Sequence, residues 1–207
     1  MANILIIGDS QAGNPGAAAK AALVALGHTV TQIHNDGDSP VTYVNTPSLW
    51  NQYTSLAAQN DLVLLIFGHN SPAGTATSNA LVQMRDSVHA PVYMSGPPQY
   101  PPDASPTSSG QPSQQVGDAL RTQNQAIFGA NYIDAYPSTP TSLPRDSLGW
   151  HLTPTSAQGW GQAMATVMDQ AARGGAGMGV AIAIGATAVG ALALVLVAVV
   201  RRRRARA

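Results

Sequence analysis

Three short stretches of this chain carry side chains that could together perform acyl-transfer chemistry. "ILIIGDS" places Ser10 where an apolar run ends, "FGHN" contains Asn70, and "PRDSLGWHLTP" contains Asp146 and His151. A serine hydroxyl becomes a nucleophile when a neutral imidazole accepts its proton, and a carboxylate can fix the tautomer of that imidazole. An asparagine amide can donate a hydrogen bond to the oxyanion that forms. The residue types therefore predict a nucleophilic serine centre, provided that the fold brings them together.

Each stretch taken alone has a simpler explanation. Ser10 or its neighbour Asp9 can cap the helix that follows, and Asn70 suits a turn. An isolated His151 is more often a structural or surface residue, and the side chain of His69 is expected to point away from Asn70. The occurrence of all three pieces in order along the chain favours a common site over three independent structural roles.

Strand-like and helix-like segments alternate along the chain and must position these residues. Continuous apolar runs predict strands at 3–8, 29–33, 61–67, 91–95 and 131–134, as in a parallel sheet covered on both faces. Helices are expected at 15–26, 48–59, 75–89, 113–128 and 153–172, and 96–112 is expected to be a long surface loop. We therefore predict an α/β fold, a three-layer α/β/α domain over 1–173 with a five-stranded parallel sheet. Sites in such sheets form at the carboxyl ends of the strands.

Composition narrows the function classes. The chain has no Cys, which excludes thiol catalysis, disulfides and cysteine-based metal sites. Five of its ten basic residues lie in the Arg-rich tail at 201–207, so 1–173 holds five basic residues against ten Asp, a formal charge of −5. A body of that sign offers no nucleic-acid surface, and only the Arg tail is suited to such a partner.

The segment 176–200 contains no charged residue and is expected to form a transmembrane helix. Its 25 residues would span roughly 37 Å as a helix, enough to cross a hydrocarbon core of about 30 Å. A buried core helix is the alternative. Gly174 and Gly175 form the expected hinge, and small residues at four-residue spacing leave a homo-oligomer open.

The expected membrane topology contains a conflict. The Arg tail should face anionic headgroups on the cytoplasmic side, which would put the globular body outside, yet the first residues do not resemble a secretory signal. Tail-anchored insertion, an unusual translocation route or placement in a virus particle would each resolve the conflict. The expected localisation is therefore a membrane, with the virus particle as one setting.

Over roughly residues 3–172 the sequence resembles the SGNH, or GDSL-like, hydrolases, a family of flavodoxin-like esterases and lipases. "LIIGDS" resembles the first block and implies Ser10 as nucleophile, and "GHN" resembles the third and implies Asn70 in the oxyanion hole. "HLT" resembles the fifth block and implies His151 as general base, and Gly37 in "HNDGDSP" is the best match for the oxyanion glycine of the second block. The backbone N–H of Ser10 would complete the oxyanion hole.

Two departures accompany this resemblance. Ser71 stands where the family usually has Asp after the asparagine, a change expected to affect loop packing more than chemistry. The family spaces its acid and base as Asp-x-x-His, whereas four residues separate Asp146 from His151. Asp146 reaches the ring only if residues 147–150 loop out. Otherwise a Ser–His dyad remains, or another acceptor such as Asp134.

The resemblance implies a serine esterase that needs no cofactor, with small acyl esters, including O-acetyl carbohydrate, as substrates. A weakly active or non-catalytic structural or carbohydrate-attachment protein on the same fold, of a virus particle among other settings, is the alternative. Zinc bound by His34, His69 and His151 is disfavoured because no paired ligand spacing supports it. A nucleotide site is disfavoured because the glycines of "GDSQAGNPG" match neither phosphate-binding pattern.

Overall fold

A five-stranded parallel sheet forms the centre of the computed structural model, which describes residues 1–174. The strands lie in the order β2-β1-β3-β4-β5, the flavodoxin-like order, and this confirms the predicted α/β architecture. Their bounds are Asn3–Gly8 (β1), Thr29–His34 (β2), Leu62–Ile66 (β3), Val92–Ser95 (β4) and Tyr132–Ile133 (β5).

Six α-helices connect and cover the described strands, and three short 3-10 turns accompany them. The helices are Asn14–Ala25 (α1), Pro40–Asn45 (α2), Pro47–Ala57 (α3), Thr75–Asp86 (α4), Ser113–Phe128 (α5) and Gln158–Ala172 (α6). The 3-10 turns are Ser10–Ala12 (η1), Gly129–Asn131 (η2) and Tyr136–Ser138 (η3).

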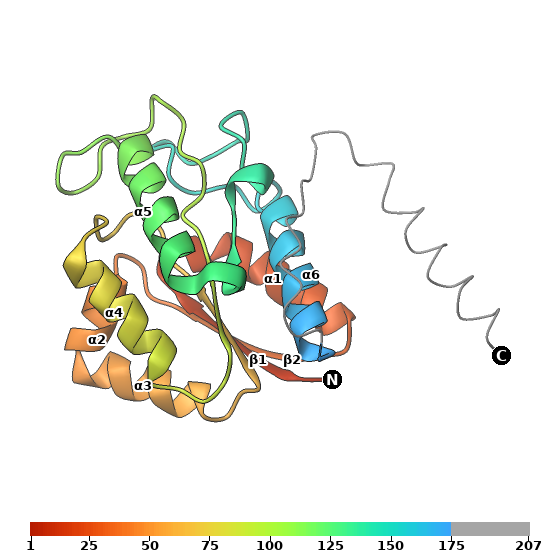
Figure 1. Cartoon of the computed structure of the whole chain (residues 1–207). Helices are drawn as coiled ribbons and strands as arrows, with labels where there is room; N and C mark the ends of the chain where they lie inside the picture. The colour runs from red at the N-terminus through yellow and green to blue at the C-terminus, as the bar shows by residue number, and fades with distance from the viewer. Residues whose placement is uncertain (175–207) are drawn as a thin grey trace.

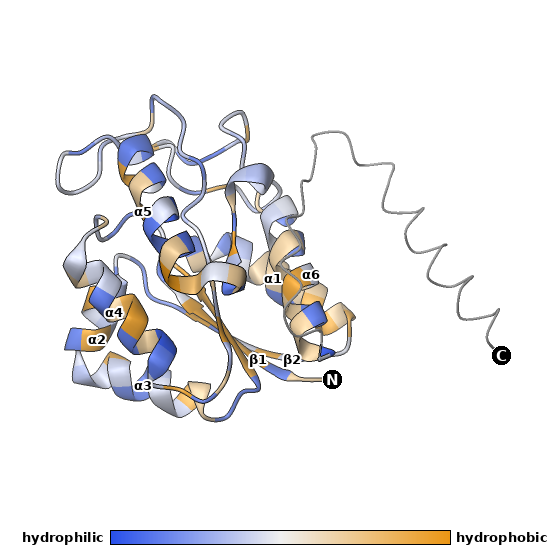
Figure 2. Cartoon of the chain, viewed as in Figure 1, coloured by the Kyte–Doolittle hydropathy of each residue, from blue (hydrophilic) through white to orange (hydrophobic). Residues whose placement is uncertain are grey.

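Alternate side chains of the inner strands feed two separate hydrophobic cores, which produces three layers (Figure 1). Ile4 and Ile6 of β1 face α1 and α6, where they meet Trp160 and Met164. Leu5 and Ile7 face the opposite core, which takes side chains from α2 to α5. Both faces of β1 and β3 are buried, which is why these strands read as unbroken apolar runs. Figure 2 shows the inner strands as mainly apolar between helices that also carry polar residues.

One helix was not predicted and the start of another was predicted too early, each for a local reason. The short helix α2 was not expected, although Ser39 caps it by accepting a hydrogen bond from Thr42 N–H and Pro40 begins it. Thr46 then adopts an extended conformation before Pro47, because proline disfavours a helical residue before it, and this separates α2 from α3. The last helix was expected from residue 153, but residues 153–157 form turns and α6 begins at Gln158.

The long connections gather at the carboxyl edge of the sheet, at the top of the view in Figure 1. They include 96–112, which contains neither helix nor strand, as predicted, and 139–157, which precedes α6. Over 1–174 no helix combines the length and the apolar character needed to cross a bilayer. The predicted hinge at 174–175 straddles the end of the described residues, and the predicted membrane helix 176–200 and Arg tail 201–207 lie outside them.

Candidate active site

Ser10 occupies the tight turn that follows β1. Gly8 ends the strand, and a Cβ there would lie 1.8 Å from the Ile66 carbonyl oxygen of β3, so only glycine allows the two strand ends to approach this closely. Asp9 then caps the 3-10 turn η1 by accepting a hydrogen bond from Gln11 N–H at 2.8 Å. The turn presents the Ser10 hydroxyl at the carboxyl edge of the sheet, where the long loops meet.

Asp146 and His151 lie on one closed turn between Arg145 and Leu152, which pair as an antiparallel bridge. Asp146 N–H donates to the His151 carbonyl at 2.9 Å, so the four residues between them loop out. Gly149 has φ +75°, a left-handed conformation that glycine adopts without strain, and it allows this reversal. The wider spacing of acid and base is thus absorbed by the turn.

The side chains of Ser10, His151 and Asp146 form one hydrogen-bonded chain. His151 Nε2 lies 2.8 Å from Ser10 Oγ, and His151 Nδ1 lies 2.6 Å from Asp146 Oδ2. The other carboxylate oxygen of Asp146 accepts hydrogen bonds from the N–H groups of Trp150 at 2.9 Å and Leu148 at 3.2 Å. The structure therefore brings together three of the sequence-predicted site residues, including the one whose spacing left its contact open.

The electrostatics of the Ser10–His151–Asp146 hydrogen bonds favour a proton on Nδ1 of His151. Desolvation opposes ionisation of Asp146, but the hydrogen bonds from the His151 ring and from Trp150 N–H outweigh it and hold the pKa of this carboxyl below its ordinary value. An ionised Asp146 accepts the Nδ1 proton. Nε2 is then left as the acceptor for the Ser10 hydroxyl, which is the arrangement that a general base requires.

The predicted oxyanion donors share one pocket of about 200 Å³ with Ser10 and His151. Gly37, with φ +80°, and Asn70 both line it. Among residues 1–174 the N–H groups of Ser10 and Gly37 have no acceptor, so both are available to an oxyanion. Asn70 is placed as expected but its amide is engaged: Nδ2 donates to Asp9 Oδ2 and to the Asp38 carbonyl, both at 3.0 Å.

Asp9 is a site residue that sequence reasoning treated only as a helix cap. Its carboxyl is 1% exposed and joins the ends of β1 and β3, accepting hydrogen bonds from Gly68 N–H at 2.8 Å and from Asn70. Burial raises its pKa to about 7, against the hydrogen bonds from Gly68 and Gln11 N–H, which lower it. The group that holds the Asn70 amide therefore carries a proton over part of the physiological pH range.

The buried Asp9 carboxyl is expected to give a pH-dependent contribution to stability. The folded protein keeps its proton up to a pH of about 7, whereas the unfolded chain releases it near the ordinary value of 3.8. Folding therefore takes up a proton in this window, and this contribution falls by about 4 kcal/mol as pH rises through it. Denaturant unfolding of wild type and Asp9→Asn from pH 4 to pH 8.5 measures it as the difference between the two curves.

The stability of wild type has to be compared with that of Asp9→Asn because His69 changes stability with pH in the opposite sense to Asp9. Burial lowers the pKa of His69 to about 4, so its contribution to stability rises with pH up to the unfolded value of 6.5. The two effects offset each other in wild type, whereas the contribution of Asp9 is absent from Asp9→Asn and that of His69 remains. Parallel curves for the two proteins would contradict the assignment to Asp9.

His69 does not point away from the site as expected, because its ring lines the same pocket as Ser10 and Asn70. Trp150, which precedes the proposed base, lines it as well, and the ring centroids of His69 and Trp150 lie 4.8 Å apart. The position of His69 beside Asn70 was the only sequence signal. Its contact with Trp150 joins residues far apart in the sequence, and no local pattern predicts it.

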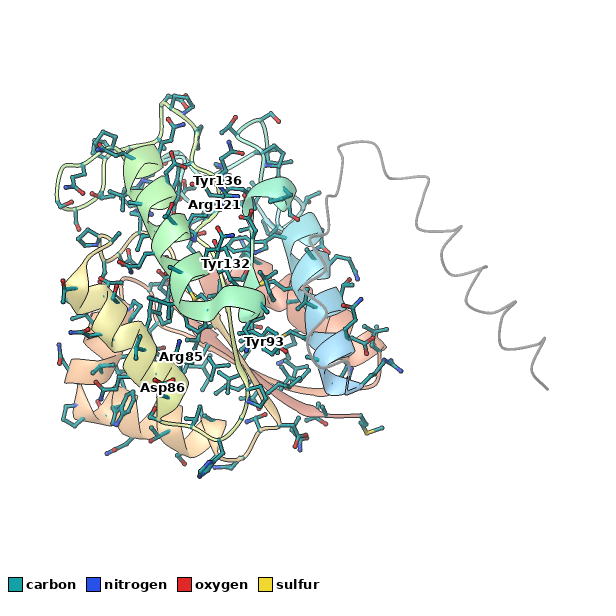
Figure 3. All side chains as sticks on the ribbon, in the orientation of Figure 1. Arg85, Asp86, Tyr93, Arg121, Tyr132 and Tyr136 are labelled. Atoms are coloured by element: carbon teal, nitrogen blue, oxygen red, sulfur yellow. The ribbon has the colours of Figure 1, made fainter. Side chains whose placement is uncertain are left out.

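The structure also bears on the alternative carboxylate, Asp134, and on the disfavoured zinc site. Asp134 forms an ion pair with Arg121, which lies over the ring of Tyr136, and Figure 3 shows these two labelled residues side by side. Asp134 is therefore engaged away from His151. Over 1–174 no group of three His, Asp, Glu or Cys side chains is arranged to hold a metal ion.

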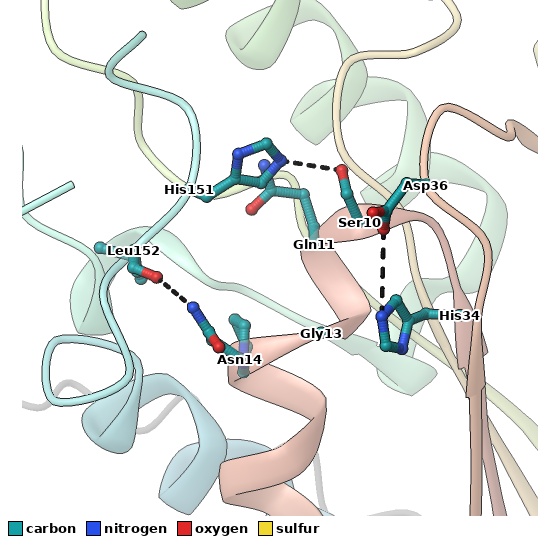
Figure 4. A pocket seen from close by; sticks show the side chains of 9 residues that line it. Ser10, Gln11, Gly13, Asn14, His34, Asp36, His151 and Leu152 are labelled. Atoms are coloured by element: carbon teal, nitrogen blue, oxygen red, sulfur yellow. Dashed lines mark hydrogen bonds and ion pairs between the residues drawn. The ribbon is translucent and has the colours of Figure 1, made fainter. Parts of the chain in front are cut away.

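A second pocket, of about 220 Å³, also has Ser10 and His151 in its lining (Figure 4). Hydrogen-bonding side chains line it, among them Gln11, Asn14, His34 and Asp36. His34 lies 3.9 Å from Asp36 as a weak pair, and Asn14 Nδ2 donates to the Leu152 carbonyl at 2.8 Å. Ser10 and His151 therefore line two small pockets, and this second one has the more polar lining of the two.

Solved structures share the fold of this chain at low sequence identity. A carbohydrate acetylesterase from Sinorhizobium meliloti superposes with a TM-score of 0.61 at 16% identity, over 84% of this chain and 99% of its own. An aryl esterase from M. smegmatis superposes with a TM-score of 0.55 at 17% identity, over 82% and 99%. A protein from Parabacteroides merdae assigned as a GDSL-like lipase gives 0.60 at 14% identity, over 81% and 95%. Neither a protein-family model nor a curated protein matches the sequence.

Proposed function

We propose that this protein is a serine ester hydrolase that cleaves small acyl esters. One observation carries the proposal: the hydrogen-bonded chain from Ser10 Oγ through His151 to Asp146, with distances of 2.8 Å and 2.6 Å. Two findings support it. The chain shares its fold with carbohydrate acetylesterases and aryl esterases, and its motifs resemble those of SGNH hydrolases at the same residues.

In the proposed acylation step, Ser10 Oγ attacks the ester carbonyl carbon while His151 Nε2 takes the hydroxyl proton. Asp146 stabilises the imidazolium that results. The oxygen of the tetrahedral intermediate accepts hydrogen bonds from the N–H groups of Ser10 and Gly37. Asn70 joins them by exchanging one of its two present acceptors for the oxyanion.

Collapse of the intermediate breaks the bond to the alcohol, which leaves with the proton from His151. Water then attacks the acyl group on Ser10, and His151 takes a proton from that water. A second collapse returns the proton to Ser10 Oγ and releases the carboxylic acid. Every proton in both steps moves through the one nitrogen, His151 Nε2, that faces Ser10, and no cofactor enters.

We assign the acyl half of the substrate to the pocket that Gly37, Asn70 and His69 line, because the available oxyanion N–H groups lie there. Its volume of about 200 Å³ suits a short acyl group. The alcohol half then occupies the polar pocket beside Asn14, His34 and Asp36. Such a lining suits an alcohol with further hydroxyl groups, and acetylated carbohydrate is the proposed substrate class.

Ester hydrolysis by the full-length chain in detergent tests the proposal. We expect turnover of p-nitrophenyl acetate and of a peracetylated monosaccharide, and inactivation by a fluorophosphonate that labels Ser10. Absence of turnover on every short acyl ester would favour the alternative, a structural or carbohydrate-attachment protein. Binding of the acetylated carbohydrate without hydrolysis, measured by calorimetry, would then identify the carbohydrate-attachment role.

We further propose that residues 176–200 attach the protein to a membrane, an inference from the uncharged apolar sequence of this segment. The full-length protein is expected to stay with the membrane pellet in alkaline carbonate, whereas a chain ending at residue 174 is expected in the supernatant. Equal partitioning of the two chains would contradict the proposal.

A further inference from the structure

The ring of His69 forms part of the wall of the proposed acyl pocket. It is held between two aromatic side chains, edge-on to both Tyr100 and Trp150, with ring centroids 4.9 Å and 4.8 Å apart. Only 7% of the residue is exposed. Because His69 lines the pocket, this small exposed part faces the space beside Ser10.

Tyr100 fixes the tautomer of His69. The Tyr100 side chain is fully buried, and among residues 1–174 the hydrogen-bond partner of its hydroxyl is His69 Nδ1, at 2.8 Å. Burial raises the pKa of Tyr100 well above its ordinary value, so the phenol keeps its proton and needs an acceptor. His69 Nδ1 is that acceptor, and the proton of the neutral ring therefore lies on Nε2.

The Nε2–H group of His69 is an unused donor. It has no acceptor among residues 1–174, and it is not sealed from solvent. Burial, with a smaller effect of His151, lowers the pKa of His69 to about 4, so the ring stays neutral at the pH values where an ester hydrolase of this type works. The pocket thus contains a fixed, uncharged hydrogen-bond donor besides those proposed for the oxyanion.

We propose that His69 Nε2–H binds a second oxygen atom in the acyl group, so that the protein prefers acyl chains with an ether, hydroxyl or keto oxygen over alkyl chains of equal size. The inference rests on the proposed function. The ester carbonyl oxygen goes to the N–H groups of Ser10 and Gly37, which leaves His69 for an oxygen further along the chain. An alkyl chain that displaces water from this donor leaves it unpaired, and such a loss discriminates strongly between substrates.

Two esters of matched size test this preference: p-nitrophenyl methoxyacetate and p-nitrophenyl butyrate, which differ by one oxygen in place of a methylene. The measured quantity is the ratio of their kcat/KM values in wild type and in His69→Phe, because intrinsic reactivity cancels in that comparison. We expect the ratio to fall by about tenfold in His69→Phe. His69→Gln, which carries an amide donor near the position of Nε2, is expected to recover part of it.

His69→Phe leaves the buried Tyr100 hydroxyl without an acceptor, and a double variant controls for this loss. In His69→Phe/Tyr100→Phe both polar groups are gone, and the ratio is expected to be as low as in His69→Phe, with better stability. An unchanged ratio in both variants, with acetate still hydrolysed, would overturn the inference while the proposed function stands. Absence of turnover by wild type on every short acyl ester, p-nitrophenyl acetate and methoxyacetate included, would instead overturn the function.

The tautomer is measurable without turnover. In ¹⁵N spectra of the imidazole groups at pH 7, with the His69 signal assigned from its absence in His69→Gln, we expect a neutral ring protonated at Nε2. Tyr100→Phe is expected to redistribute the proton between the two nitrogens, since it removes the hydroxyl that fixes Nδ1 as acceptor. A ring protonated at Nδ1 in wild type would overturn the inference.

Discussion

Alanine in place of Ser10 is expected to lower kcat for ester hydrolysis by roughly a millionfold, the loss typical of removing a serine nucleophile. The reason is geometric, because Ser10 Oγ is the atom that faces His151 Nε2 at 2.8 Å, and alanine leaves the base with nothing to deprotonate except water. Steady-state turnover of p-nitrophenyl acetate and covalent labelling by a fluorophosphonate measure the effect. Both signals should disappear together.

Ser87→Ala is the matched control for this substitution. Ser87 follows the last residue of α4, at the opposite edge of the sheet from Ser10, and within 1–174 the hydrogen bond of its hydroxyl goes to the Met84 carbonyl, at 3.4 Å. We expect wild-type turnover and labelling in this variant, and the same circular dichroism in both variants. Ester hydrolysis at the wild-type rate by Ser10→Ala would remove Ser10 from the mechanism.

Asparagine in place of Asp146 is expected to lower kcat by roughly ten-thousandfold while Ser10 and His151 remain in place. The carboxylate oxygen that faces His151 Nδ1 at 2.6 Å becomes an amide N–H₂, because the other oxygen is held by the N–H groups of Leu148 and Trp150. Nδ1 must then accept instead of donating, and the proton moves to Nε2. The base can no longer take the serine proton. Stopped-flow or steady-state kinetics on p-nitrophenyl acetate measure the loss.

Asp134→Asn separates this effect from the loss of an aspartate in general. Asp134 also forms a hydrogen-bonded ion pair, but with Arg121 and away from His151. This variant is expected to keep the wild-type kcat and to lose only some stability. If Asp146→Asn instead retains kcat within tenfold of wild type, the protein works as a Ser–His dyad, which the sequence alone had left open.

The sequence predicted those helices and strands whose formation depends mainly on the residues within the segment itself. The strand 3–8 and the helix 113–128 were predicted with the bounds that the structure shows, because an unbroken apolar run and an amphipathic repeat are complete signals in themselves. The start of α6 was missed because residues 153–157 turn instead of continuing a helix: Ala157 N–H donates to the Thr153 carbonyl in a single turn. Helix-forming residue types alone do not distinguish a turn that precedes a helix from the first turn of the helix itself.

The site was predictable to the level of residue types but not of contacts. Ser10, Asn70 and His151 each follow a recognisable motif, and the structure places all of them at the pocket. The hydrogen bonds that determine what Asn70 can do come from Asp9 and Asp38, which lie 61 and 32 positions away. Likewise, the acceptor for Tyr100 is 31 positions away. These pairs form only when the strand ends and loops meet, so no local pattern contains them.

The turn between Arg145 and Leu152 has a consequence for how related chains are recognised. Within it, the acid is oriented by backbone groups of the same turn, and the Arg145 guanidinium fastens the turn to the Gln99 carbonyl at 2.6 Å. Acid and base thus lie at the two ends of one turn that closes on itself, and the two residues added to the Asp-x-x-His spacing lie inside that turn. A search that demands a fixed interval between them would discard chains of this kind, whereas one that asks for a closable loop ahead of the histidine would retain them.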